Sequence, residues 1–178
     1  HDGDLITFTT AEDIIGTAKK VFMKYQNFPN DVNPGERILL DDGKLIFEII
    51  ETDKKSEVIA RVIQGGELKS KKGVNLPNTK ISLPAMTEKD IADALFAIEQ
   101  NVDWIALSFV KTPQDLQQLQ ELIAEHSDCK IPIIAKIEMP EALENIDKIV
   151  AYCDGLMVAR GDLGVELPAH GVPLVQKE

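Results

Sequence analysis

Four residues in the second half of the chain have the types and spacing for chemistry on a phosphorylated anion. Lys136 and Glu138 end one apolar run, and Gly161 and Asp162 follow the next. Residues two apart on a strand project to the same face, so Lys136 and Glu138 are expected side by side. Two carboxylates with open positions suit Mg²⁺, which keeps waters and takes further ligands from a substrate. A lysine beside that metal suits phosphate or carboxylate, so these residues predict work on a small anionic substrate.

The elements that must position these residues form a strand–helix–strand unit. Ile131–Ile137 and Gly155–Ala159 are apolar almost throughout, as expected for parallel strands covered on both faces. Pro140–Tyr152, between them, has a helical pattern with one apolar side: Leu143, Ile146, Ile149 and Val150. The charged residues therefore gather at the carboxyl ends of neighbouring strands, where such folds bind ligands. Gly161 would let the backbone approach a ligand closely at this edge.

The chain resembles the pyruvate kinases in a paired signature and in four further segments that stand in the family's order and spacing. The paired signature of that family is similar to IIAKIE and GLMVARGDLGVE in this chain. Four further segments resemble it: LLDDGK at 39–44, SKKGVNLP at 70–77, LPAMTEKD at 83–90 and DWIALSFV at 103–110. The likeness covers nearly the whole chain, more loosely before Glu36.

The resemblance implies an enzyme, a phosphotransferase of glycolysis that converts phosphoenolpyruvate and ADP to pyruvate and ATP. Glu138 and Asp162 would hold Mg²⁺ or Mn²⁺. Lys136 would act as the catalytic residue that offsets charge on the phosphoryl group in flight. The backbone N–H of Gly161, together with that of Asp162, would bind the substrate carboxylate. Met139 replaces the family's usual Asn, so altered support of the metal site is expected rather than lost metal binding.

Two residues of the N-terminal half are candidates for nucleotide binding through the same resemblance. Asp42 lies in an Asp-Gly hairpin signal, and Lys72 lies in a cationic run before Gly73. The resemblance places Asp42 on a mobile lid that closes over the nucleotide and excludes water, and it implies that Lys72 helps hold the nucleotide phosphates where the chain re-enters the barrel. The alternatives are a plain turn residue for Asp42 and a solvated return crossing for Lys72. The family's Leu-Pro-Gly ends in Asn78 here, and Asn tolerates positive φ, so the bend is expected to persist.

We expect an α/β fold: part of a TIM (β/α)8 barrel with an inserted, small all-β lid domain. Residues 1–76 carry short β-prone runs and polar turns, typical of a closed or sandwiched β domain. Residues 77–178 contain predicted strands that start near positions 104, 131 and 155, a spacing typical of repeated βα units. A complete barrel takes about 250 residues. A piece of a longer enzyme, inactive alone, is therefore expected.

Local signals predict where several elements begin and end. Thr87 and Asp90 form a capping-box pattern at the start of a helix, and Asn101 suits a left-handed end to it. Thr112-Pro113 starts a second helix, after a strand predicted over Trp104–Val110. Phe28–Gly35, rich in Pro, Asn and Asp, reads as a loop.

The composition argues against a nucleic-acid-binding or membrane-spanning protein. The 178 residues are 44% hydrophobic and 28% charged, ordinary for a soluble globular protein. The net charge of −11 argues against a nucleic-acid surface. No apolar run approaches the roughly 18 residues of a membrane span, and no signal peptide is seen. Cys129 and Cys153 lack metal spacing, so we expect free thiols and a cytoplasmic protein.

Other roles remain open. The resemblance to the pyruvate kinases implies a homotetramer under allosteric control. It also implies that K⁺ is bound by residues outside this chain. Arg160 is expected in a structural or subunit-facing ion pair, with substrate contact as the alternative. Ser108 and Phe109 end a strand at the same rim, where Phe109 is either packing or a pocket wall. The rival functions are a metal-dependent lyase or aldolase on a pyruvate-type barrel, and a non-catalytic nucleotide-binding fragment. Binding of ADP with metal would separate the kinase from the lyase or aldolase.

Overall fold

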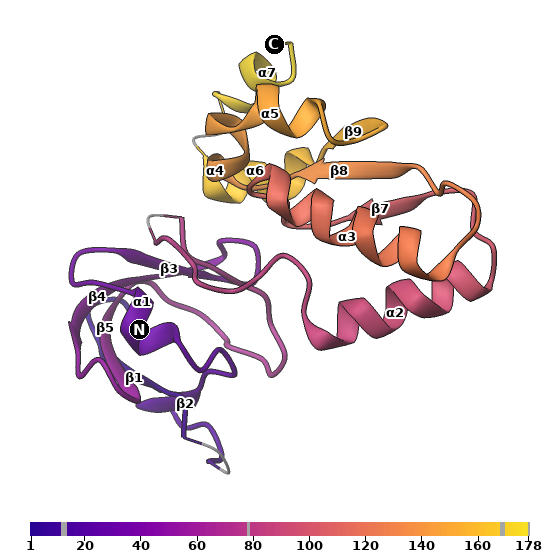
Figure 1. Cartoon of the computed structure of the whole chain (residues 1–178). Helices are drawn as coiled ribbons and strands as arrows, with labels where there is room; N and C mark the ends of the chain where they lie inside the picture. Colours follow the sequence, from indigo (N-terminus) through magenta and orange to yellow (C-terminus); the bar gives the residue numbers. More distant parts are fainter. Residues whose placement is uncertain (12–13, 78, 168–169, 178) are drawn as a thin grey trace. The chain divides into compact units, whose positions relative to one another are not determined.

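The chain divides into two compact units, His1–Ser82 and Leu83–Glu178. The computed structural model describes residues 1–11, 14–77, 79–167 and 170–177 (Figure 1). The segment 79–82 belongs to the first unit, whereas the sequence predicts a boundary after residue 76. The bend expected at Asn78 lies outside the described residues. No described helix is long and apolar enough to cross a membrane.

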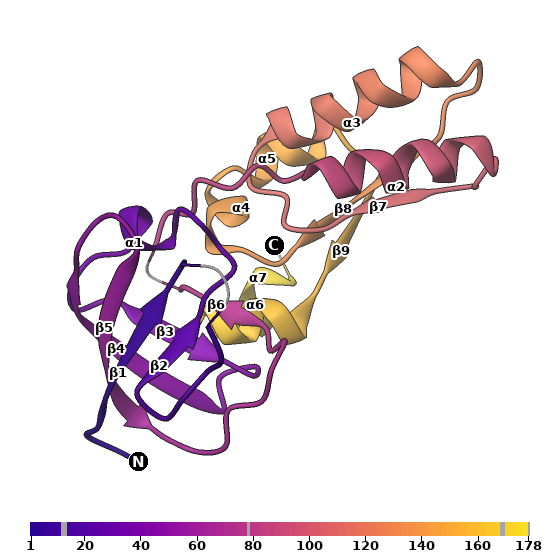
Figure 2. The same ribbon diagram turned by 90° about the horizontal axis from the view of Figure 1, so that it is seen from below.

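The first unit is built on a six-stranded sheet with the order β2-β1-β5-β4-β3-β6 (Figure 2). Its described elements are β1 Leu5–Thr9, β2 Lys20–Phe22, α1 Phe28–Asp31, β3 Arg37–Leu40, β4 Leu45–Thr52, β5 Glu57–Gln64 and β6 Val74–Asn75. Strands β1 and β2 are parallel, and the other paired strands are antiparallel. The first six residues of β4 alternate between buried and half-buried, the period of a strand with one face on a core. The β-rich first half expected from the sequence is therefore present.

An aromatic cluster fills the core of this unit. Phe8 of β1 lies edge-on to Phe28 and Phe47, with ring centroids 6.0 and 5.4 Å apart. Phe28 opens α1, and it is completely buried. The loop predicted over Phe28–Gly35 is thus wrong at its start. Pro29 fixes a helix-compatible φ in the first turn, and burial of Phe28 stabilises that turn against the core.

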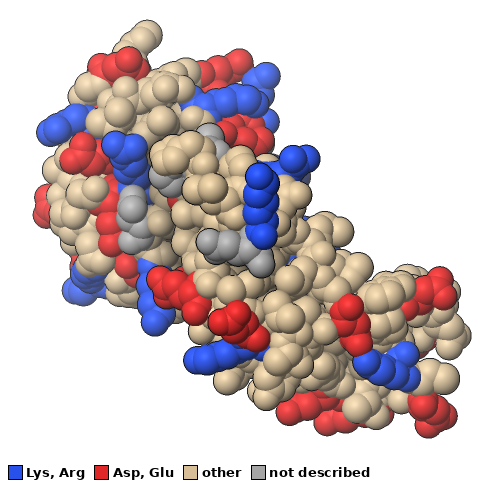
Figure 3. Space-filling model, turned by 90° about the horizontal axis from the view of Figure 1, so that it is seen from above, with Lys and Arg blue, Asp and Glu red and all other residues tan. Residues whose placement is uncertain are grey.

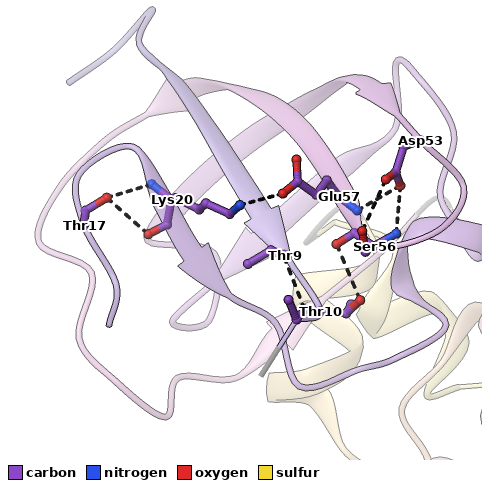
Figure 4. Close-up of polar contacts among 8 residues, drawn as sticks. Thr9, Thr10, Thr17, Lys20, Asp53, Ser56 and Glu57 are labelled. Atoms are coloured by element: carbon purple, nitrogen blue, oxygen red, sulfur yellow. Dashed lines mark hydrogen bonds and ion pairs between the residues drawn. The ribbon is translucent and has the colours of Figure 1, made fainter. Parts of the chain in front are cut away.

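Polar contacts hold the strands together where β5 begins (Figure 4). Lys20 of β2 pairs with Glu57 of β5 at 2.5 Å, across the intervening β1. The Asp53 carboxylate accepts the backbone N–H groups of Lys55, Ser56 and Glu57 at 2.8, 2.8 and 2.9 Å. These bonds, that of Glu57 first, lower the pKa of Asp53 to about 2. The turn between β4 and β5 is therefore organised around one ionised carboxylate.

The second unit is built on a parallel sheet with the order β7-β8-β9. Its strands are β7 Ile105–Leu107, β8 Ile133–Ile137 and β9 Gly155–Val158. The described helices are α2 Glu88–Glu99, α3 Pro113–His126, α4 Pro140–Glu144, α5 Ile146–Val150, α6 Arg160–Glu166 and α7 Val172–Val175. The repeated βα order and the parallel sheet predicted for this half are confirmed.

Two helices of the second unit begin where local sequence signals predict. Thr87 and Asp90 form the predicted capping box at the start of α2. Asn101 has φ 53°, the left-handed conformation expected at the end of that helix. Helix α3 begins at Pro113 as predicted, and it buries Leu116, Leu119 and Ile123.

The helix predicted over Pro140–Tyr152 is interrupted. Helices α4 and α5 are separated at Asn145, whose side-chain amide donates to the carbonyl oxygens of Lys111 and Glu141 at 3.2 and 3.1 Å. Asn side chains compete with the helix for backbone partners, which explains the break. The expected apolar side is only partly right, since Ile149 is buried but Val150 is 49% exposed.

Candidate active site

Lys136 and Glu138 meet where β8 ends. Lys136 lies on the strand, Glu138 follows it directly, and Lys136 Nζ is 2.6 Å from Glu138 Oε1. The extended backbone sends both side chains to one face, as their spacing predicted. The side chain of Glu138 is only 2% exposed, whereas that of Lys136 is 25% exposed. A nearly buried carboxylate is thus paired with a cation that still reaches solvent.

The end of β7 completes the surroundings of this pair. Ser108 Oγ accepts a hydrogen bond from Lys136 Nζ at 2.8 Å. The backbone N–H of Phe109 donates to Glu138 Oε2 at 2.9 Å. Strands β7 and β8 are parallel neighbours, so their carboxyl ends lie at the same edge. Both oxygens of Glu138 therefore have a donor.

The first turn of α6 places Gly161 and Asp162 directly after β9. This helix starts at Arg160, and the sequence did not predict it because its two glycines favour a loop. Gly161 and Asp162 are exposed, and a methyl group added at Gly161 would meet no atom within 4 Å. Strand β9 is the parallel neighbour of β8, so Asp162 follows the same edge of the sheet as Glu138. Within the described residues, no hydrogen bond or ion pair joins Asp162 to Lys136 or Glu138.

The donor set fits a hard divalent cation that is completed by its substrate. Glu138 offers a carboxylate held by two donors, and Asp162 offers an exposed one. Of the described side chains, no group of three or more His, Cys, Asp or Glu gathers into a full metal cage. Mg²⁺ commonly binds through one or two carboxylates and takes its other ligands from waters and substrate phosphates. Two carboxylates at an accessible edge suit that mode.

The two nucleotide candidates lie near each other in the first unit. The predicted hairpin joins β3 and β4, and its turn has φ values of 52° at Asp41, 58° at Asp42 and 81° at Gly43. Lys72 Nζ pairs with Asp41 Oδ1 at 2.8 Å, so its direct partner is the neighbour of the predicted residue. The pKa of Lys72 is raised by its hydrogen bond to Asp41, by the charge of Asp41 and, less, by that of Asp42. The exposed Asp42 therefore shares one charged cluster with Lys72.

The remaining residues singled out in the sequence differ in how far they are exposed to solvent. Arg160 is exposed, and no ion pair within the described residues involves it, so its subunit-facing role stays a prediction. Phe109 is 54% exposed with φ 55°.

Cys129 and Cys153 are free thiols, as expected, and burial raises the pKa of Cys153. Acidic and basic side chains are interspersed on the face shown in Figure 3.

Comparison with known proteins identifies what this arrangement is similar to. The family model described as "Pyruvate kinase, barrel domain" matches residues 1–178. The chain is 51% identical to a pyruvate kinase of Bacillus licheniformis over 168 residues, covering 94% of this chain and 29% of the relative. It is 48% identical to one of Geobacillus stearothermophilus over 177 residues, covering 99% and 30%.

A solved structure agrees with these relatives. The crystal structure of a pyruvate kinase from Cryptosporidium parvum matches with a TM-score of 0.92 and 34% identity, over 99% of this chain and 37% of that one. The fold class expected from the sequence, part of a TIM (β/α)8 barrel with an inserted all-β domain, is confirmed. The chain spans 29%, 30% and 37% of the lengths of these three relatives.

Proposed function

This chain belongs to the pyruvate kinase family, and on that premise we propose that the protein carrying it transfers a phosphoryl group from phosphoenolpyruvate to ADP, giving pyruvate and ATP. The observation that supports this most is the Lys136–Glu138 pair at the carboxyl edge of a parallel sheet. Phosphoryl transfer depends mainly on positioning and on electrostatic stabilisation, and both can come from one fixed ammonium and a pair of carboxylates.

Lys136 is the proposed catalytic residue. An ammonium group has three N–H donors, and two of them are directed at Ser108 and Glu138. The third remains for an oxygen of the phosphoryl group during its transfer. Since the Lys136 ammonium is held by both Ser108 and Glu138, it keeps its direction while the substrate binds.

Glu138 and Asp162 are the proposed metal ligands. Mg²⁺ or Mn²⁺, when bound, polarises the oxygen atoms of the substrate and offsets their charge. Glu138 is held by Lys136 and by the backbone of Phe109, which leaves its carboxylate with little freedom to turn. Asp162 is exposed in the first turn of α6, where an acidic side chain also favours the helix.

The backbone of Gly161 and Asp162 is proposed to bind the substrate carboxylate. N–H groups in the first turn of a helix lack partners within the helix, and they favour anions. The open space beside Gly161 leaves that backbone accessible. Any residue other than glycine at this position would place its side chain in this space.

Asp42 and Lys72 are proposed to contact the nucleotide. In the free protein Asp41 neutralises Lys72, and the phosphates of ADP would compete for the same ammonium. The exposed Asp42 in the adjacent turn would face the metal bound to that nucleotide. Mobility of the β domain as a lid is part of this proposal, because closure would exclude water from the transfer.

Further properties are proposed from family membership. They are a requirement for K⁺, a homotetramer with allosteric control, and a cytoplasmic location. We also propose that the 178-residue chain is inactive by itself. Within the described residues, β7 and β9 each pair on one side only, and a closed barrel leaves no such edge.

A coupled assay tests the proposed function. The complete natural polypeptide that carries this chain should form pyruvate and ATP from phosphoenolpyruvate and ADP, only with Mg²⁺ or Mn²⁺ present. Calorimetry should detect binding of ADP with the metal, which a lyase or aldolase would not bind. Metal-dependent cleavage of a pyruvate-type substrate without ADP binding would overturn the proposal in favour of the lyase.

A further inference from the structure

Contacts from the end of β7 surround the Lys136–Glu138 pair. We propose that Ser108 and the backbone of Phe109 are positioning residues, with Ser108 directing the Lys136 ammonium and Phe109 directing the Glu138 carboxylate. The two contacts measure 2.8 Å from Ser108 Oγ to Lys136 Nζ and 2.9 Å from Phe109 N to Glu138 Oε2. The inference rests on the proposed function, because it assigns roles within the same site.

Ser108 fixes a direction that Glu138 alone cannot fix. A lysine side chain is long and flexible, and one ion pair leaves its ammonium free to rotate about a single contact. The Ser108 hydroxyl, which directly follows the neighbouring strand β7, provides a second acceptor 28 positions earlier in the chain. Two acceptors that follow different strands determine where the third N–H points. That third donor is the one that the transferred phosphoryl group would meet.

Phe109 is held in a conformation that its side chain does not favour. Its φ of 55° lies in the left-handed region, which bulky residues rarely adopt. The ring is 54% exposed, so burial of the ring does not explain the conformation. The N–H of Phe109 is directed to Glu138 just beyond the last residue of β7. Uncommon backbone conformations of this kind concentrate where the surroundings fix a functional group.

The Phe109–Glu138 contact has a structural use in the fold, whereas the Ser108–Lys136 contact does not. A buried carboxylate needs donors in any folded protein, so the Phe109 contact also has a structural use. The Ser108 hydroxyl has no such use, because both oxygens of Glu138 keep their donors without it. Removing this hydroxyl should therefore leave the fold intact and disturb the direction of Lys136. A substitution at Ser108 can therefore test the positioning of Lys136 without a change in the stability of the fold.

The test compares three variants in the complete natural polypeptide: Ser108→Ala, Ser108→Thr and, as a control, Ser127→Ala. The hydroxyl of Ser127 bonds to Cys129, before β8 begins. Ser108→Ala should lower kcat about ten- to a hundredfold, the effect of losing one hydrogen bond to a charged group, and should change the KM for phosphoenolpyruvate less than about threefold. Ser108→Thr should recover most of kcat, and Ser127→Ala should match wild type. Wild-type kcat in Ser108→Ala at an unchanged melting temperature would overturn the role of Ser108.

Two measurements that need no turnover accompany the kinetics. Titration with Mn²⁺, followed by electron paramagnetic resonance, should give Ser108→Ala the wild-type affinity; a tenfold weaker affinity would mean that Ser108 supports Glu138 rather than Lys136. A crystal structure of Ser108→Ala should show Lys136 Nζ displaced, and an unmoved Nζ overturns the inference. If the wild-type protein fails to convert phosphoenolpyruvate, the proposed function fails, and this crystal structure still decides the positioning role.

Discussion

Lys136 Nζ lies 2.6 Å from Glu138 Oε1, across a single intervening residue at the end of β8. The pair places the Lys136 ammonium, which is partly exposed to solvent, beside the Glu138 carboxylate, which is almost completely buried. Neither group is a simple surface charge, because removing one partner leaves the other without its counter-ion in a partly dry site. Substitutions here should therefore separate catalysis, metal binding and stability.

Replacing Lys136 with Met should reduce turnover by a factor on the order of a hundred or more, as removing one key electrostatic donor does in other enzymes. The apparent affinity for Mn²⁺ should survive, because the bound ion itself offsets the charge of Glu138. Steady-state kinetics and Mn²⁺ titration of the complete polypeptide measure the two effects. A collapse of metal affinity together with turnover would show that Lys136 serves the metal site, contrary to its proposed role.

Replacing Gly161 with Ala should weaken substrate binding and leave the fold unharmed. The new methyl group meets no atom of the protein, and Ala is favoured over Gly in a helix by up to about 1 kcal/mol. The melting temperature should thus stay equal or rise, while the KM for phosphoenolpyruvate rises. Gly164→Ala, in the same helix, is the matched control, since its methyl group would meet Val172 at an ordinary 3.9 Å. Equal KM values in both variants would contradict carboxylate binding at Gly161.

Substitutions at Phe109 should reveal its backbone strain. A β-branched residue tolerates the left-handed region poorly, so Phe109→Val should destabilise the protein by about 1–2 kcal/mol. Phe109→Gly should cost less than Phe109→Val, although it removes more side chain, because glycine adopts this φ freely. Denaturant unfolding of both variants tests the order. A larger loss in Phe109→Gly would mean that packing of the ring, and not the backbone, dominates.

The turn around Asp53 should respond to acid. Its pKa is lowered to about 2 by the three backbone N–H groups that it accepts. The stability contributed by the ionised carboxylate is complete above its ordinary pKa of 3.8, and it is lost as the pH falls toward 2. Melting curves of wild type and Asp53→Asn should thus differ at pH 6 and converge near pH 2. A difference that stays constant over this range would contradict the assignment.

Local chemistry made much of the architecture predictable. Period-two spacing placed Lys136 beside Glu138, and the Thr87–Asp90 capping box marked the start of α2. The break at Asn145 was not predicted, because one of its two side-chain hydrogen bonds, the one to Lys111, joins positions far apart in the sequence. The contact of Ser108 was hidden for the same reason, since its partner Lys136 is 28 positions further along the chain. Residues whose use depends on a neighbouring strand cannot be assigned from spacing alone.

Glu138 and Asp162 are proposed to share one divalent ion beside Lys136. Anomalous diffraction from crystals of the complete polypeptide, grown with Mn²⁺ and phosphoenolpyruvate, tests it most directly. We predict a single Mn²⁺ peak within coordination distance of carboxylate oxygens from both residues, with Lys136 Nζ directed at the phosphoryl group. A Mn²⁺ ion bound away from Glu138 and Asp162, or held by only one of them, would contradict the account.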